Sequence, residues 1–117
     1  MRFLKLYGKI KLSNNKLRAL EAFSKGKDFH EISRKLRVQR ATTEVYTINA
    51  FAAGKDIDTD RLAELLEITD ESFSQLHQLL SVKDHLNEVK EAFPEVSYNQ
   101  IRFVLACMIR DVVIHVK

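Results

Sequence analysis

The basic side chains between residues 25 and 37 carry the most readable chemistry of this sequence. Clustered Lys and Arg contact phosphate oxygens, Lys as a point charge and Arg as a two-pronged hydrogen-bond donor. Surface Lys and Arg are more often simply solvated, so this prediction depends on whether the surrounding elements form a binding motif. The candidate phosphate-binding residues are Lys25, Lys27, Arg34, Lys35 and Arg37.

A second group of candidate residues lies on the helix predicted to follow. An apolar stripe at helical spacing is predicted to face the core, formed by Ala41, Val45, Ile48 and Ala52. The opposite face then carries polar side chains able to reach the edges of bases. The candidate base-facing residues are Gln39, Arg40, Thr43, Glu44 and Thr47. The Glu44 carboxylate would repel phosphate, but it can accept a hydrogen bond from a cytosine amine.

Metal, thiol and carboxylate chemistry have little support in the sequence. The histidines fall on four predicted elements without a close pair at helical spacing, as His30, His77, His85 and His115. Cys107 sits in an apolar run, which predicts a buried, inert thiol. The carboxylates between Asp56 and Glu67 lack the glycine and spacing of a calcium loop and are read as helix caps and a solvated face. With no phosphate-binding loop, dinucleotide fingerprint or serine elbow, we expect no catalysis, cofactor or metal in this segment.

Capping residues and apolar periodicity predict helices along most of the chain. In the first half we expect helices over residues 14–25 after Ser13, over 29–36 after Asp28, and from Gln39 or Arg40 toward Gly54. In the second half we expect a short helix capped by Asp58 or Thr59, a helix capped by Thr69 and a helix that ends at Pro94. The last helix should be buried and capped by Ser97. The fold class is therefore all-α, a compact domain of about six or seven helices. Residues 1–12 fit a helix or a strand equally, and residues 112–116 could extend as a strand instead of continuing the last helix.

Charge divides the chain into unlike halves. Residues 1–55 hold 13 Lys and Arg against 4 Asp and Glu, a net charge of +9, whereas residues 56–117 hold 6 against 12, a net charge of −6. We predict an N-terminal segment of uncertain structure (1–12), a basic three-helix part (13–55) and an acidic helical part packed on it (56–117), all in one folded unit. A single cysteine and the lack of a secretory or membrane-spanning segment favour an intracellular compartment, the nucleus in a eukaryote or the cytoplasm and nucleoid in a bacterium.

The segment from Ile32 to Thr42 has the spacing of a helix-turn-helix. Small Ser33 allows the two helices to approach closely, and Leu36 and Val38 fill the angle between them. In such a motif the second helix enters the major groove of DNA, while basic residues around it contact phosphates. A three-helix packing core with an inert outer face is the alternative, and the basic first half favours binding.

Four stretches together resemble a known domain. These are Leu17 to Phe23, the helix-turn-helix, Ala53 to Asp58 and Val96 to Ala106. In this order they resemble the helix-turn-helix domain at the C-terminus of RecQ-type, Werner-like DNA helicases, over roughly residues 15–110. The resemblance implies an all-helical accessory module whose ATPase motor lies elsewhere, acting in DNA repair and recombination. The sequence departs from the common pattern at Arg37, where Gly is frequent, and at Thr43, where an apolar residue is usual.

The leading hypothesis is thus a non-catalytic module of a RecQ-type helicase that docks on the phosphates of duplex or forked DNA, with low sequence specificity. One alternative is a protein-interaction module that binds a helicase core or a repair or replication factor. An exposed patch of Phe3, Leu6, Tyr7 and Ile10 would favour it. The other is a free-standing helix-turn-helix transcription regulator, which would need a dimer with defined half-site spacing.

Overall fold

Most helices of this protein begin at a residue whose side chain caps them. The computed structural model describes residues 12–83, 85–112 and 114. In it, five side chains accept a hydrogen bond from a backbone N–H of the first helical turn, those of Ser13, Asp28, Asp58, Thr69 and Ser97. Asp28 and Glu31 form both bonds of a capping box. The predicted helix starts are therefore confirmed.

The described part of the chain is entirely helical. Its helices are α2 (Asn14–Ser24), α3 (Phe29–Leu36), α4 (Arg40–Ala52), α5 (Thr59–Leu65), α6 (Asp70–Val82), α7 (Leu86–Ala92) and α8 (Tyr98–Arg110), and the described residues include no strand. The predicted all-α fold is confirmed. Val112 and Ile114 lie outside any strand, while residues 113, 115 and 116 of the same tail and residues 1–11 lie outside the described residues.

Two glycines end helices as predicted. Gly26 follows α2 with φ of 92°, and Gly54 follows α4 with φ of 99°. Both angles lie in the region that an L side chain adopts only with strain, so glycine turns the chain there at little cost. The first turn leads into α3 and the second into the segment before α5.

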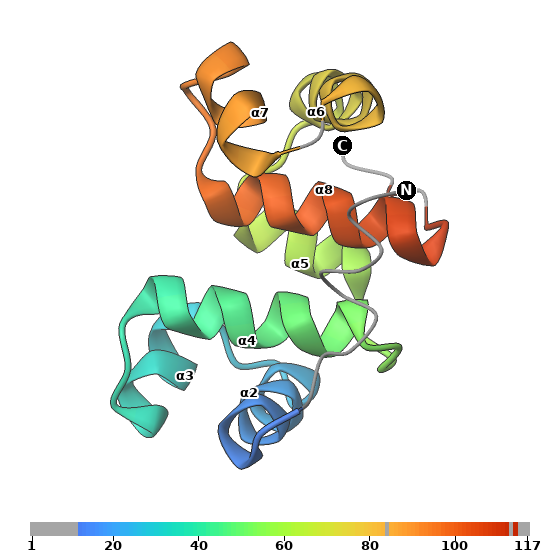
Figure 1. Ribbon diagram of the computed structural model, residues 1–117. Helices are drawn as coiled ribbons and strands as arrows, with labels where there is room; N and C mark the ends of the chain where they lie inside the picture. The colour runs from blue at the N-terminus through green and yellow to red at the C-terminus, as the bar shows by residue number, and fades with distance from the viewer. Residues whose placement is uncertain (1–11, 84, 113, 115–117) are drawn as a thin grey trace.

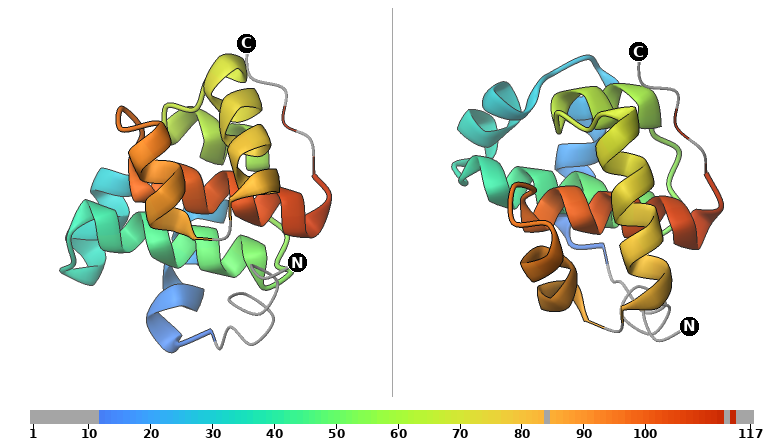
Figure 2. Two further views of the ribbon diagram at one scale, coloured as in Figure 1. Left: turned by 45° about the horizontal axis from the view of Figure 1, so that its top comes forward. Right: turned by 90° about the horizontal axis from the view of Figure 1, so that it is seen from above.

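Helices α4 and α8 lie side by side in the middle of the molecule (Figures 1 and 2). Helices α2 and α3 pack against α4, and α6 and α7 pack against α8. The centre of the core lies between these layers, where the rings of Phe51 on α4 and Phe103 on α8 have centroids 6.2 Å apart. As predicted, α8 is the most deeply buried helix, with Ile101 and Phe103 to Cys107 all inaccessible to solvent.

Two arginines of the second half bind helix ends of the first half. Arg61 of α5 donates to the carbonyls of Phe23 and Lys27, at 2.6 and 2.5 Å. Arg110, at the end of α8, donates to the carbonyls of Phe51 and Lys55, at 3.1 and 3.0 Å. The carbonyls of Phe23 and Phe51 also accept from the N–H groups of Gly26 and Gly54 at 3.0 Å, so each guanidinium adds a second hydrogen bond at a helix end and joins it to the turn that follows.

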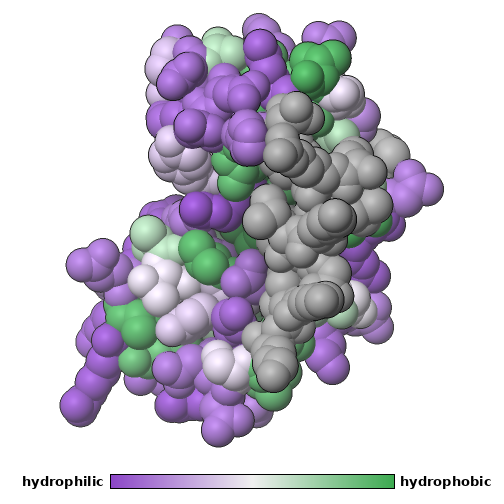
Figure 3. Space-filling view, viewed as in Figure 1, coloured by the Kyte–Doolittle hydropathy of each residue, from purple (hydrophilic) through white to green (hydrophobic). Residues whose placement is uncertain are grey.

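The surface seen in Figure 3 is mostly hydrophilic, with apolar side chains in small separate areas. Among the described residues, only Leu17, Val82 and Tyr98 are large apolar or aromatic side chains that are well exposed. No helix in the described ranges has the length and hydropathy that crossing a bilayer requires.

Candidate nucleic-acid interface

The turn between α3 and α4 places a basic side chain at a corner of the molecule. Arg37 follows α3 in the left-handed conformation, with φ of 56° and ψ of 46°. The N–H of Val38 then bonds back to the carbonyl of Ser33, at 3.1 Å, which closes the turn without a glycine. The side chain of Arg37 is exposed.

All five predicted phosphate-binding residues are exposed, but only three are without an ion pair. Lys25 pairs with Glu21 at 3.0 Å and Lys27 with Glu31 at 3.5 Å, whereas Arg34, Lys35 and Arg37 have no carboxylate within pairing distance among the described residues. The hydrogen bond and charge of Lys25, together with the charge of Lys35, lower the pKa of Glu21 below its ordinary value. These three residues of the α3 end, Arg34, Lys35 and Arg37, are called the basic corner below.

The N-terminus of α4 lies directly after the basic corner. Its N-cap is Gln39, an exposed residue whose side chain makes no capping hydrogen bond. The first N–H groups of a helix carry partial positive charge and favour an anion. The N-terminus of α4 therefore adds to the positive electrostatic potential that Arg34, Lys35 and Arg37 produce.

Two of the predicted base-facing residues are buried, so that part of the prediction is wrong. Thr43 and Thr47 are both fully inaccessible to solvent. Ser33 Oγ donates to the carbonyl of Phe29 at 2.6 Å and bonds to Thr43 Oγ1 at 2.7 Å, while Thr47 donates to the carbonyl of Glu44 at 2.9 Å. Because each hydroxyl has a partner, these threonines can be buried without the cost of an unsatisfied polar group.

The apolar stripe of α4 is correspondingly turned away from its predicted position. Ile48 is buried as expected, but Ala41 is exposed and Val45 and Ala52 are only partly buried. The helix instead buries Thr43, Thr47, Ile48, Ala50 and Phe51. It contacts α2 and α3 on one side and α8 on the other, while Arg40 and Ala41 in its first turn remain exposed.

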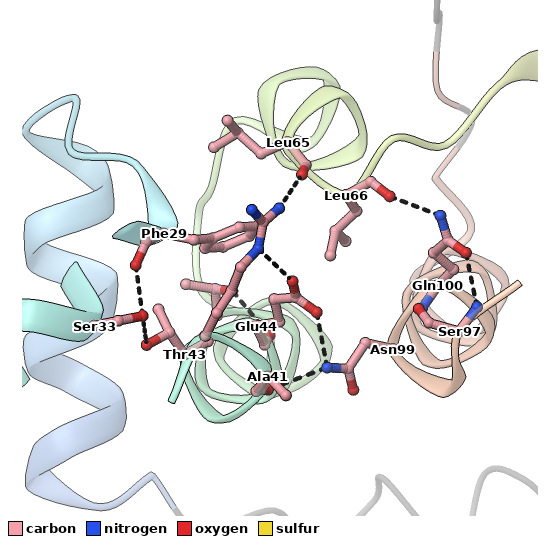
Figure 4. Close-up of polar contacts among 12 residues, drawn as sticks. Phe29, Ser33, Ala41, Thr43, Glu44, Leu65, Leu66, Ser97, Asn99 and Gln100 are labelled. Carbon is pink, nitrogen blue, oxygen red and sulfur yellow. Dashed lines mark hydrogen bonds and ion pairs between the residues drawn. The ribbon is translucent and has the colours of Figure 1, made fainter. Parts of the chain in front are cut away.

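Arg40 and Glu44, also predicted to face bases, are held by the protein itself (Figure 4). Arg40 donates to Glu44 Oε2 at 3.0 Å and to the carbonyl of Leu65 at 3.1 Å, and its guanidinium lies 5.6 Å from the ring centroid of Phe29. Glu44 Oε1 accepts a hydrogen bond from the Asn99 amide at 2.9 Å, and its side chain is only 15% exposed. These contacts occupy the Glu44 carboxylate and two of the three guanidinium nitrogens of Arg40, whose side chain is 58% exposed, and so reduce the groups free for direct base readout. Gln39 and Arg40 are the exposed members of the five, and of these two only Arg40 is held by side-chain hydrogen bonds, since Gln39 makes no capping bond.

The first turn of α8 contributes residues that the sequence did not single out. The Asn99 amide also donates to the carbonyl of Ala41 at 3.1 Å, which fastens α8 to the start of α4. Tyr98 and Arg102 stand one helical turn apart, with the guanidinium 5.7 Å from the tyrosine ring centroid. Their spacing of four residues after the Ser97 cap was the available signal, because it places both on one face.

The part of the chain that the structure describes contains no group of His, Cys, Asp or Glu arranged to hold a metal ion. His30, His77 and His85 lie on different elements, and His115 lies outside the described residues. Cys107 is fully buried in α8, and burial raises the pKa of its thiol to about 12.

A family profile described as a helix-turn-helix domain matches residues 15–105, most of the chain. The protein belongs to this helix-turn-helix domain family. Comparisons with curated proteins and with solved structures gave no match. In the helix-turn-helix domain, α3 is the first helix of the motif, residues 37–39 form the turn and α4 is the second helix. Helix-turn-helix domains in general bind DNA, so nucleic acid is the class of partner that the family indicates. The match gives no link to RecQ-type helicases, and that resemblance stays a prediction.

Proposed function

We propose that this helix-turn-helix domain is a non-catalytic module that binds DNA through its phosphates and reads little sequence. The observation that carries the proposal is the basic corner, where three exposed cations without ion pairs adjoin the uncapped start of α4. Phosphate contacts position a protein on DNA, while base contacts specify the sequence. Few side chains of α4 are left to contact bases, because Arg40 and Glu44 bond within the protein and Thr43 and Thr47 are buried.

A salt titration of two matched variants tests the proposal. Arg34→Ala with Arg37→Ala removes two charges from the basic corner, and Arg18→Ala with Lys55→Ala removes two exposed charges elsewhere in the first half. The slope of log K against log salt should fall by roughly 0.9 per lost phosphate contact in the first variant and stay unchanged in the second. Fluorescence anisotropy with labelled duplex DNA measures both slopes. Equal slopes in the two variants, or binding that does not depend on salt, would contradict the proposal.

The setting that we propose is a RecQ-type DNA helicase, and it rests on the sequence resemblance alone. An accessory module of such an enzyme should prefer the fork that the enzyme unwinds. We expect forked DNA to bind more tightly than a blunt duplex of equal length, with little change between unrelated sequences. Equal binding to fork and duplex would argue against the helicase setting, and strong dependence on sequence would favour a transcription regulator.

A hollow between α6 and α7 favours a second candidate function, binding of a protein. The hollow has a volume of about 580 Å³ and is lined in part by Leu79, Val82, Phe93 and Glu95. Val82 is 76% exposed there. Since the second half has a net charge of −6 and uses Arg61 and Arg110 internally, the occupant that fits is a basic amphipathic helix of a helicase core or repair factor.

A pair of synthetic helices tests this second candidate. A peptide with a leucine stripe and flanking lysines should shift the methyl resonances of Leu79 and Val82, and the same peptide with glutamates should not. Val82→Asp should abolish the shifts and leave DNA binding unchanged. If neither peptide shifts these resonances, the candidate fails.

A further inference from the structure

A groove separates the start of α4 from the start of α8. It has a volume of about 370 Å³, and its walls include Ala41, Thr42 and Val45 on α4 and Tyr98 and Arg102 on α8. Figure 3 shows the molecule indented on this side, between the parts formed by α4 and α7. Glu44 and Asn99, which are joined by a hydrogen bond of 2.9 Å, also line the groove, while Ala41 and Tyr98 at its walls are exposed, so the groove is accessible beside the helix-turn-helix.

The α8 wall of the groove presents a partly exposed aromatic ring beside a guanidinium. Tyr98 is 41% exposed, which is unusual for an aromatic side chain in this protein. Arg102 lies with its guanidinium 5.7 Å from the ring centroid and donates to Asn99 Oδ1 at 2.8 Å. The hydrogen bond orients the guanidinium, and a ring and a guanidinium plane are the two surfaces on which proteins stack unpaired bases.

The polar groups at the base of the groove are already satisfied. The Asn99 amide donates to Ala41 and Glu44, and its oxygen accepts from Arg102. Among the described side chains, no buried nitrogen or oxygen lacks a hydrogen-bond partner. A ligand of this groove is therefore held by contact with the ring and with the small apolar side chains of α4, rather than by many directed hydrogen bonds. A flat heterocycle fits that chemistry.

Charge indicates what the heterocycle is attached to. The groove lies at the same end of the molecule as the α3–α4 turn, where α4 and α8 both begin (Figures 1 and 2). The α3–α4 turn, which follows the basic corner, lies at this same end, and Arg102 lines the groove together with Glu44, whose carboxylate pairs with Arg40 at 3.0 Å. A base linked to a chain of phosphates is the ligand for which this combination is suited.

We propose that this groove binds an unpaired nucleobase, stacked on Tyr98 beside Arg102, at the place where a single strand leaves the duplex held by the basic corner. The inference rests on the proposed function, because the basic corner must first hold the DNA. It adds a preference for single-stranded ends that comes from stacking and not from sequence.

Three DNA probes separate stacking from phosphate contact. The first is a blunt duplex, the second is the same duplex with a short oligothymidine tail, and the third has a tail of equal length built from abasic residues. The wild-type protein should bind the thymidine tail roughly 5- to 150-fold more tightly than the abasic tail, the range that stacking of a base on an aromatic side chain supplies. Tyr98→Ala should remove this difference, and Tyr98→Phe should keep it. A photoreactive iodouracil in the tail should crosslink to the peptide that contains Tyr98.

A control variant and the blunt duplex distinguish a failure of the stacking site from a failure of the proposed DNA binding. Ser74→Ala, which changes an exposed side chain on α6 outside the hollow and the groove, should change none of the three affinities, and circular dichroism should show that every variant is folded. The stacking site would be overturned if the wild-type protein bound thymidine and abasic tails equally, or if Tyr98→Ala lowered the affinity for all three probes by the same factor. Neither result would contradict the proposed phosphate contacts. Absence of binding to any probe would overturn both.

Discussion

Arg37 is the residue at which structure and proposed function meet most directly. A left-handed backbone costs a non-glycine residue about 1–2 kcal/mol, and glycine avoids this cost. The side chain of Arg37 makes no ion pair among the described residues that would compensate for this strain. What an arginine offers at this corner is a long, exposed cation, which suits a phosphate contact.

Replacement of Arg37 therefore separates stability from binding. Arg37→Gly should raise the free energy of unfolding by about 0.5–1 kcal/mol, because relief of strain exceeds the greater flexibility of glycine in the unfolded chain. It should also weaken DNA binding. Arg37→Ala is the matched control, since it removes the cation but keeps the strain. Urea denaturation and anisotropy measure the two effects. A glycine variant less stable than the wild type would show that the arginine side chain supports the fold.

Cys107 ties stability to pH at the residue scale. Burial raises the pKa of the thiol from 9.0 to about 12, so the folded protein keeps the proton over a range in which the unfolded chain loses it. Stability is therefore unaffected by this group below pH 9 and falls as the pH rises from 9 toward 12, by up to about 1.4 kcal/mol per pH unit. The free energy of unfolding of Cys107→Ala should fall less steeply between pH 9 and 10.5. Identical slopes in urea titrations would refute this account.

At the scale of elements, the contact between α3 and α4 depends on a buried pair of hydroxyls. The small size of Ser33 was predicted to allow close packing, and the structure adds its hydrogen bond to Thr43. Removal of one hydroxyl leaves the other buried without this partner, whereas removal of both leaves an apolar contact. The pair therefore couples the two helices of the motif.

A double-mutant cycle measures that coupling. Ser33→Ala and Thr43→Val should each lower the free energy of unfolding by about 1–3 kcal/mol. The double variant should lose clearly less than the sum of the two, because neither partner remains unsatisfied. Thermal and urea denaturation provide the values. Strict additivity would mean that the two hydroxyls do not act as a pair.

On the scale of the whole molecule, the helix-turn-helix depends on the acidic half. Phe51 and Ile48 of α4 are buried, and the Phe51 ring packs at a tilt of 31° against the ring of Phe103 on α8. Asn99 and Arg110 of α8 bond to α4 or to the residues that follow it. Separation of the halves would expose this apolar face and leave these polar groups without partners.

We therefore expect residues 1–57 not to fold by themselves. The isolated segment should show low helicity by circular dichroism, no cooperative thermal transition and little dispersion of its amide resonances, because α4 loses its contact with α8, one of the three helices that it packs against. The full chain should unfold in one transition. A cooperative transition in the isolated segment would show that α8 is dispensable for the motif.

Helix boundaries, both glycine turns, the buried last helix and the position of the motif followed from the sequence alone. Caps such as Ser13 and Ser97 act within one helical turn, and apolar residues cover most of the circumference of α8, so both features can be predicted from local sequence. The same holds for the charge division of the chain.

The orientation of α4 was decided only by tertiary structure. Its sequence offers two competing faces, one with Ala41 and Val45 and one with Thr43 and Thr47, and a threonine can be buried wherever its hydroxyl finds a partner. The contacts that choose between them reach far along the chain, from Arg40 to a carbonyl 25 residues away and from Ala41 to an amide 58 residues away. Local patterns therefore determined that α4 is a helix of a helix-turn-helix. Long-range hydrogen bonds and packing decided which of its side chains are buried, and left the groove beside Tyr98 open.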